Sequence, residues 1–247
     1  MIDIHQHLLY GVDDGPRDLE ASMAIAKAAI EGGITHVVCT PHANHEYEFN
    51  PTRNEERLGA IRERLGGKLV LGRGCDMYLS PANIDEAMEN PAKFTINGGR
   101  YLLVEFASFT IPKDIGDTFY EFLLKGIVPV ITHPERNPIL ARDPDQMKDW
   151  LGSGCRLQIT AASGNGYFGR EAKACYWNLL ERDWVSFVAT DAHHVEGRLP
   201  AMSEAYAAIA RKMGEDTAKR LFVANPLAAF ENAPLPEHPE FQAAQLR

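Results

Sequence analysis

Histidine, aspartate and glutamate recur where short apolar segments of this sequence end. His5 and His7 close the apolar segment that starts at Ile2. In an extended strand, residues two positions apart point to the same side, so the two imidazoles converge on one point, as metal ligands must. A lone His-x-His pair also arises by chance, and the rest of the chain decides its meaning.

The same feature recurs at four further apolar segments. Their polar residues are His42, Glu105, His133, Asp191 and His193. In a parallel α/β barrel the carboxyl ends of all strands lie on one face, where active sites are assembled. Histidines with a purely structural role would not favour the same end of each strand. The sequence therefore predicts a metal centre at these strand ends.

Two aspartates near these positions allow more than one interpretation. Asp76 follows a glycine-rich kink and is either an eighth metal ligand or a loop residue that forms an Asx turn. Asp14 either orients a ligand histidine, protonates a leaving group, or caps the next helix.

The mixture of imidazole and carboxylate without thiolate suits Zn, Mn or Fe better than Ca. Three divalent ions would leave a net charge of about +3 after the carboxylates of Asp76, Glu105 and Asp191, which would attract a phosphate dianion. Arg136 and Arg198 follow two of the motifs, and a guanidinium fork matches phosphate oxygens. We predict that both arginines bind phosphate; the alternative is a surface salt bridge.

Strand and helix patterns alternate along the chain, which is typical of an α/β fold with parallel strands. We expect strands at Ile2–His5, His36–Thr40, Leu69–Leu71 with continuation toward Met77, Tyr101–Phe106, Val128–Thr132, Arg156–Thr160 and Ser186–Asp191. We expect helices at Asp18–Glu31, Arg53–Leu65, Asp114–Lys125, Asp145–Leu151, Arg170–Arg182, Ala201–Lys212 and Gly214–Val223. One barrel domain fits the 247 residues, with 226–247 as a proline-containing tail.

Composition excludes several classes of protein. A formal net charge of -9 argues against nonspecific nucleic-acid binding. No apolar run approaches the roughly 20 residues that span a bilayer, and the N-terminus lacks the features of a signal peptide, so we expect a cytoplasmic protein without membrane insertion.

The four cysteines form no C-x-x-C pair and are expected to be reduced core residues. The C-x5-R phosphate loop, the P-loop, G-x-G-x-x-G and H-E-x-x-H are all missing.

Taken together, these motifs resemble the PHP (polymerase and histidinol phosphatase) superfamily, and within it the bacterial manganese-dependent protein-tyrosine phosphatases of capsule and exopolysaccharide biosynthesis. The resemblance runs from about residue 1 to 226. It rests on MIDIHQHLLYGVDDGP, the TPH of Thr40–His42, YLLVEF, THPERN, LQIT, and VATDAHH followed by GRLP.

The resemblance implies a distorted seven-stranded TIM-like (β/α) barrel with three metal ions at the carboxyl ends of the strands. We expect these ions to be manganese, with iron or zinc as alternatives. The family's ligand positions match His5, His7, His42, Glu105, His133, Asp191 and His193. The ligand of the third strand is commonly Glu and is matched here by Asp76, one methylene shorter. The resemblance also implies that Arg136 and Arg198 bind phosphate.

The predicted activity is therefore that of a metal-dependent phosphomonoesterase, in which a metal-bound hydroxide attacks phosphorus. The resemblance implies a phosphotyrosine substrate on the tail of a bacterial tyrosine kinase; homo-oligomerisation is left open. The loops that would flank the tyrosyl ring carry Tyr47, Phe49, Phe109, Tyr167 and Phe168, to which we assign no individual roles.

Three alternatives remain. The first is a PHP-type phosphatase for a small phosphomonoester such as histidinol phosphate. The second is an amidohydrolase-type metal hydrolase, although no lysine stands at a matching strand end. The third is a catalytically silent regulator that binds phosphopeptides.

Overall fold

The strands run parallel and divide into two sheets. The computed structural model describes residues 1–198 and 201–236. The smaller sheet has the order β1-β2-β4, with β1 at Ile2–Gln6, β2 at His36–Cys39 and β4 at Val70–Arg73. The larger sheet has the order β3-β5-β6-β7-β8-β9 and consists of β3 (His42–Ala43), β5 (Asp76–Tyr78), β6 (Tyr101–Glu105), β7 (Val128–Thr132), β8 (Arg156–Thr160) and β9 (Phe187–Ala189).

The strand expected from Leu69 toward Met77 is divided in two, and the strand expected at His36–Thr40 is followed by a short strand that was not expected. β2 and β3 are separated by Thr40 and Pro41, and β4 and β5 by Gly74 and Cys75. β2 pairs with β4, and β3 pairs with β5, so the two breaks lie side by side. Pro41 has no N–H to donate and interrupts the ladder. The predicted α/β fold with parallel strands is confirmed, but the strands divide into sheets of three and six instead of one sheet of seven.

The end of β1 lies beside the chain that follows β9. Gln6 forms an isolated parallel bridge with Ala192. His7 donates its backbone N–H to the carbonyl of Ala192 at 3.0 Å, and Asp191 donates to the carbonyl of His5 at 2.8 Å. These bonds bring the first and last predicted ligand pairs together.

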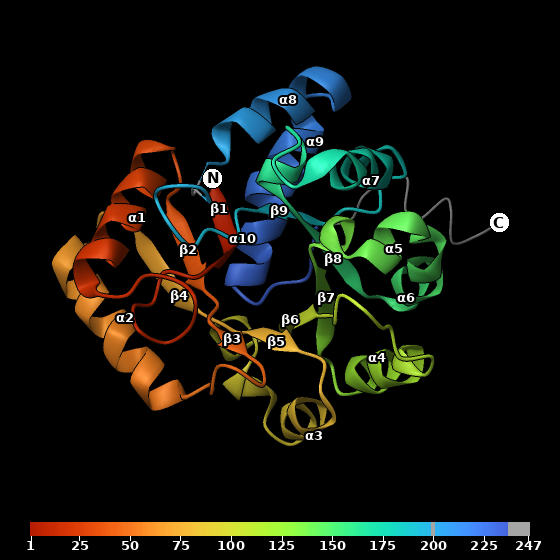
Figure 1. The fold of residues 1–247 in the computed structure, drawn as a ribbon, viewed down its shortest axis with the longest axis horizontal. Helices are drawn as coiled ribbons and strands as arrows, with labels where there is room; N and C mark the ends of the chain where they lie inside the picture. The colour runs from red at the N-terminus through yellow and green to blue at the C-terminus, as the bar shows by residue number, and fades with distance from the viewer. Residues whose placement is uncertain (199–200, 237–247) are drawn as a thin grey trace.

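Helices surround the strands (Figure 1). They are α1 (Leu19–Glu31), α2 (Pro51–Leu65), α3 (Pro81–Glu89), α4 (Ile115–Leu124), α5 (Pro138–Arg142), α6 (Lys148–Ser153), α7 (Gly169–Glu181), α8 (Ser203–Met213), α9 (Glu215–Lys219) and α10 (Asn225–Phe230). Short 3-10 segments are η1 (Pro91–Lys93), η2 (Ile96–Gly98), η3 (Pro134–Arg136), η4 (Pro144–Met147) and η5 (Ala161–Ser163). None of the helices in the described part of the chain is long and apolar enough to cross a membrane.

Several helix boundaries differ from the predictions. α3 and α5 were not expected, and the helix expected at Asp145–Leu151 begins as the 3-10 segment η4 before α6. The helix expected at Gly214–Val223 consists of α9 and a π-helical turn, η6 (Arg220–Ala224). Residues 225–230 form α10, which packs against β1, and residues 237–247 lie outside the described part.

Alternating residues of the strands pack into two apolar clusters. Leu102 and Val104 of β6 belong to the larger cluster, whereas Tyr101 and Leu103 belong to the smaller one, as the pleat of a strand requires. Glu105 continues the side of Tyr101 and Leu103, so a polar layer follows the smaller cluster along the strand. The four cysteines are free and buried, as predicted.

Candidate metal centre

The eight predicted metal ligands lie together in one cluster. Four overlapping groups have ligand atoms within 4.8 Å of one another: His7, Asp14, His42 and His193; His5, His7 and Asp76; His5, His133 and Asp191; and His42, Asp76 and Glu105. The residues come from the ends of β1, β6, β7 and β9 and from the starts of β3 and β5. Because the strands are parallel, their carboxyl ends meet on one face.

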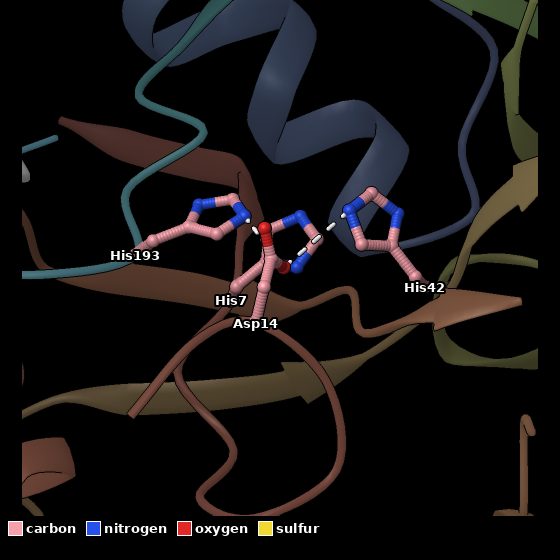
Figure 2. A group of neighbouring side chains, drawn as sticks. All are labelled: His7, Asp14, His42 and His193. Carbon is pink, nitrogen blue, oxygen red and sulfur yellow. Dashed lines mark ion pairs between the residues drawn. The ribbon is translucent and has the colours of Figure 1, made fainter. Parts of the chain in front are cut away.

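Figure 2 shows one of these groups, with the carboxylate of Asp14 between the rings of His193 and His42. Oδ1 of Asp14 lies 3.1 Å from Nε2 of His193 and 3.6 Å from Nε2 of His42. The side chain of Asp14 is 42% exposed, so this group borders solvent. The next helix is capped by Asp18, which accepts from the N–H of Ala21, so the capping role considered for Asp14 is wrong.

Asp76 is a buried member of the cluster and opens strand β5. Its Oδ2 lies 3.4 Å from Nδ1 of His42 and 3.6 Å from Nε2 of His5. Its Oδ1 accepts a hydrogen bond from Thr132 Oγ1 at 3.2 Å. The alternative of a loop residue that forms an Asx turn is therefore wrong, because Asp76 lies in a strand, and the shorter side chain still reaches the other ligands.

Two residues that the sequence analysis did not single out orient the first histidines. Gln158 on β8 accepts from Nδ1 of His5 at 2.7 Å, and Asp13 accepts from Nδ1 of His7 at 2.7 Å. These bonds place the proton on Nδ1 and turn Nε2 of both rings toward the cluster. The only signal in the sequence was the position of Asp13 beside Asp14, and of Gln158 near a strand end.

Gly15 allows the chain to pass close to His7. A Cβ at this position would lie 2.7 Å from the carbonyl oxygen of His7, closer than atoms approach without a shift. Asp13 accepts from the N–H of Gly15 at 3.0 Å and from the N–H of His42 at 3.1 Å. One carboxylate thus fixes the loop and two ligand histidines.

Burial and neighbouring charges set the ionisation of the ligands. Burial lowers the pKa of His5 to about 4, although Asp76 and Asp191 oppose this shift. Burial also lowers the pKa of His193 to about 4. Burial alone would lower the pKa of His7, but the carboxylates of Asp13 and Asp191 raise it to about 10. His5 and His193 are therefore neutral at pH 7, the form in which imidazole binds metals.

Burial and neighbouring charges also act in opposite directions on the pKa values of the carboxylates in the cluster. Burial would raise the pKa of Asp191, but His5, Arg136 and Arg198 hold it well below its ordinary value. Histidines have the same effect on buried Asp76. Burial and the charge of Asp76 raise the pKa of Glu105. Asp76 and Asp191 are thus ionised and available as ligands.

Several buried ligand atoms have no hydrogen-bond partner among the described residues. They are Oδ2 of Asp76, Oδ1 of Asp191, Nδ1 of His42 and Nε2 of His193. Leaving such atoms unpaired costs free energy, and metal coordination would satisfy them. His133 and Asp191 also adopt left-handed backbone conformations, with φ of 35° and 51°, which are uncommon outside glycine and cluster at functional sites.

The two predicted phosphate-binding arginines meet at the edge of the cluster. Nη1 of Arg136 and Nη2 of Arg198 both pair with Oδ2 of Asp191. Their side chains are 22% and 24% exposed, so both are partly open to solvent. The structure therefore does not place either arginine in a remote surface salt bridge.

Two open pockets are lined in part by residues of the cluster. One, of about 650 Å³, is lined by Asp13, Asp14 and His193 among others. A second, of about 110 Å³, is lined by Glu105, His133 and Arg136 among others. A phosphate ester can therefore approach both the ligand atoms and Arg136 from solvent.

The five loop aromatics lie in different surroundings. Tyr47 stacks on His42 with 6.1 Å between ring centroids, whereas Phe49 stacks on Phe94 and packs against the core. Phe109 is 83% exposed. Tyr167 and Phe168 contact each other, and Phe168 lies under Arg136.

Comparison with known proteins decides the family. The family model for capsular polysaccharide synthesis, CpsB/CapC, matches residues 1–231. The chain belongs to the CpsB/CapC family. It is 34% identical to the tyrosine-protein phosphatase CpsB of Streptococcus pneumoniae, over 92% of this chain and 96% of the relative. It is 32% identical to the tyrosine-protein phosphatase YwqE of Bacillus subtilis, over 87% and 86%.

A solved structure supports the same assignment. Crystal structures of YwqE from Bacillus subtilis and CpsB from Streptococcus pneumoniae, described as unique metal-dependent tyrosine phosphatases, match with a TM-score of 0.90 and 32% identity, covering 97% of this chain and 98% of the other. The predicted resemblance is confirmed. A histidinol phosphate phosphatase from Lactococcus lactis shares the fold alone, with a TM-score of 0.56 at 12% identity.

Proposed function

We propose that this CpsB/CapC chain is a metal-dependent protein-tyrosine phosphatase of capsular polysaccharide synthesis. The observation that carries the proposal is the convergence of eight His, Asp and Glu ligands on one face, with Arg136 and Arg198 joined at the ligand Asp191. The relatives named as tyrosine-protein phosphatases cover nearly the whole chain. The substrate we infer is phosphotyrosine on the tail of a bacterial tyrosine kinase, met in the cytoplasm.

The donor set fits divalent cations. The buried ligand atoms without partners, the neutral rings of His5 and His193 and the ionised carboxylates of Asp76 and Asp191 suit a cation of intermediate hardness. His5, His7, His42 and Asp76 each belong to two of the four ligand groups. Fewer ions than groups can therefore use all the ligands. We propose that the site holds three divalent ions, which are manganese in the preferred interpretation and iron or zinc in the alternatives.

We further infer that the strands act as a distorted seven-stranded barrel. In this interpretation β2 with β3 and β4 with β5 each count as one broken strand. The Gln6–Ala192 bridge then joins β1 to β9 and supports closure of the ring. All ligand positions would lie at one mouth of this barrel.

The bound metals would polarise the phosphoryl oxygens and lower the pKa of a coordinated water. Arg136 and Arg198 would donate to the remaining phosphoryl oxygens with the N–H groups that Asp191 does not hold, and would stabilise the negative charge as the ester bond breaks. Because both pair with Oδ2 of Asp191, the two guanidinium groups would be held close together.

Asp14 would hold a metal or orient its histidines. Its Oδ1 faces the ring nitrogens of both His193 and His42, so this oxygen is engaged with two ligand histidines. The tyrosine phenol is a comparatively good leaving group, so protonation by the chain is less needed. We therefore prefer the orienting role to that of a general acid.

A direct test compares two substrates with manganese-loaded protein. We expect rapid release of phosphate from a phosphotyrosine peptide and little from histidinol phosphate. Preference for histidinol phosphate would contradict the protein-phosphatase assignment. Tight binding of the phosphopeptide without any release of phosphate would instead support a catalytically silent regulator. Quantifying bound metal in the same sample would establish how many ions are present.

A further inference from the structure

An aromatic pair lies against Arg136, one of the two arginines proposed to bind phosphate. The centre of the Arg136 guanidinium lies 4.2 Å from the centroid of the Phe168 ring. Tyr167 meets Phe168 edge-on, with 4.9 Å between centroids and 84° between planes. Both aromatics follow η5, in the loop that joins β8 to α7.

Tyr167 of this pair lies near the loop that precedes the second arginine. A Cβ at Gly197 would lie 3.3 Å from the hydroxyl of Tyr167, and Gly197 directly precedes Arg198. Gly197 has a φ of +116°, which other residues rarely adopt. The loop before Arg198 can therefore pass close to Tyr167.

Phe168 is half-buried but lies outside the apolar core of the described residues. It belongs to neither apolar cluster of the described residues, even as a partly buried neighbour. Its ring contacts the guanidinium of Arg136 and the ring of Tyr167.

An aromatic face beneath a guanidinium restrains the plane of that group and leaves its N–H edges free. One edge of Arg136 already pairs with Asp191 through Nη1. With its plane set by Phe168, the remaining N–H groups of Arg136 point in fixed directions within that plane. Such preorganisation lowers the entropic cost of binding a phosphate.

We propose that Phe168, held by Tyr167, is a positioning residue that sets the plane of the Arg136 guanidinium for the phosphoryl group. The inference rests on the proposed function for its substrate, because it assigns Arg136 to phosphate binding. The proposed role requires the flat face of an aromatic ring at position 168, which an aliphatic side chain cannot supply. Other planar aromatic rings at this position should therefore serve, and aliphatic ones should not.

The experiment measures binding of inorganic phosphate to the manganese-loaded protein by calorimetry, and kcat and KM for p-nitrophenyl phosphate. Phe168→Leu keeps an apolar side chain but removes the aromatic face, and should weaken phosphate binding about three- to tenfold. We expect kcat/KM to fall by a similar factor. Phe168→Trp should restore both values to within about twofold of the parent.

A matched control comes from a second arginine that also has an aromatic face and an aspartate partner. Arg182 lies 4.7 Å from the ring centroid of Trp184 and pairs with Asp145, near the start of β9 and away from the ligand cluster. Trp184→Leu should leave phosphate binding unchanged. A double-mutant cycle adds Arg136→Lys, in which Phe168→Leu should have little further effect.

Two results would overturn the proposal. One is unchanged phosphate binding in Phe168→Leu; the other is an equal loss in the parent and in Arg136→Lys, which would indicate a general structural effect. Phosphate calorimetry requires no turnover. A protein whose phosphate binding depends on Phe168 but which hydrolyses no phosphotyrosine would refute the proposed function and support this inference.

Discussion

Gln158 offers a sharp test of how the histidine ligands are oriented. Its side chain is fully buried and its Oε1 accepts from Nδ1 of His5 at 2.7 Å. A carbonyl oxygen can only accept, so His5 must carry its proton on Nδ1, and its bare Nε2 faces His7 and Asp191 at 3.3 Å each. Gln158→Met keeps an unbranched side chain of similar length and removes the acceptor.

The substitution should have two separate effects. In the metal-free protein it leaves a buried N–H of His5 unpaired, which costs about 1–3 kcal/mol of folding free energy. For a chain of this size, Tm should fall by about 2–4 °C for each kcal/mol lost. Loss of such an outer partner also lowers metal affinity about 10–100-fold, because His5 no longer presents a fixed Nε2.

Electron paramagnetic resonance of free Mn²⁺ measures the affinity, and thermal unfolding after chelation measures the stability. Gln158→Glu is the matched control, because its carboxylate still accepts from Nδ1 of His5. We expect Gln158→Glu to retain tight manganese binding that Gln158→Met loses. If Gln158→Met bound manganese as tightly as the parent, the hydrogen bond to His5 would not orient the ligand, and the reasoning would fail.

Three further outcomes follow from the site and the core. Chelation should abolish phosphotyrosine hydrolysis and added Mn²⁺ should restore it, so full activity in a chelated sample would contradict metal dependence. His5→Ala and Asp191→Ala should each remove hydrolysis of p-nitrophenyl phosphate while circular dichroism shows the fold intact; residual activity near the parent level would exclude them as ligands. Phe119 is 1% exposed and contacts Phe106 and Trp150, so Phe119→Ala should lower the free energy of unfolding by about 3–5 kcal/mol, as measured by denaturant titration. A loss below about 1 kcal/mol would instead show that neighbouring side chains fill the cavity.

The ligand cluster could be predicted because residue type and strand end are both visible in the sequence. Parallel strands bring their carboxyl ends to one face. The strand pattern alone therefore predicted that His133 and Asp191 lie close together. Asp76 was harder, because a break at Gly74 and Cys75 hides the start of β5. Its burial against His5 and His42 became visible only in three dimensions.

The outer partners could not be predicted for a physical reason. Gln158 contacts His5 across 153 residues of sequence, and an amide is not by itself a typical metal ligand. Its role depends on β8 lying across from β1, which no local pattern records. Phe168 is a similar case, because its partner Arg136 lies on the loop after another strand. Local patterns also missed α3 and α5, two short helices that begin with proline.

Hydrogen bonds between the strand ends hold the ligands in place before any metal binds. Asp3 is fully buried, and its carboxylate accepts from the N–H and hydroxyl of Thr190, the N–H of His5 and the amide of Gln6. These bonds join the end of β1 to the residue before Asp191, so two ligands from opposite ends of the chain are fixed through their backbones. The backbone thus sets the positions that the metals would occupy, and the overall charge of -9 says little about a centre where two arginines face several ligands. Metal should therefore complete a folded site here, in contrast to small zinc domains that fold only when metal binds.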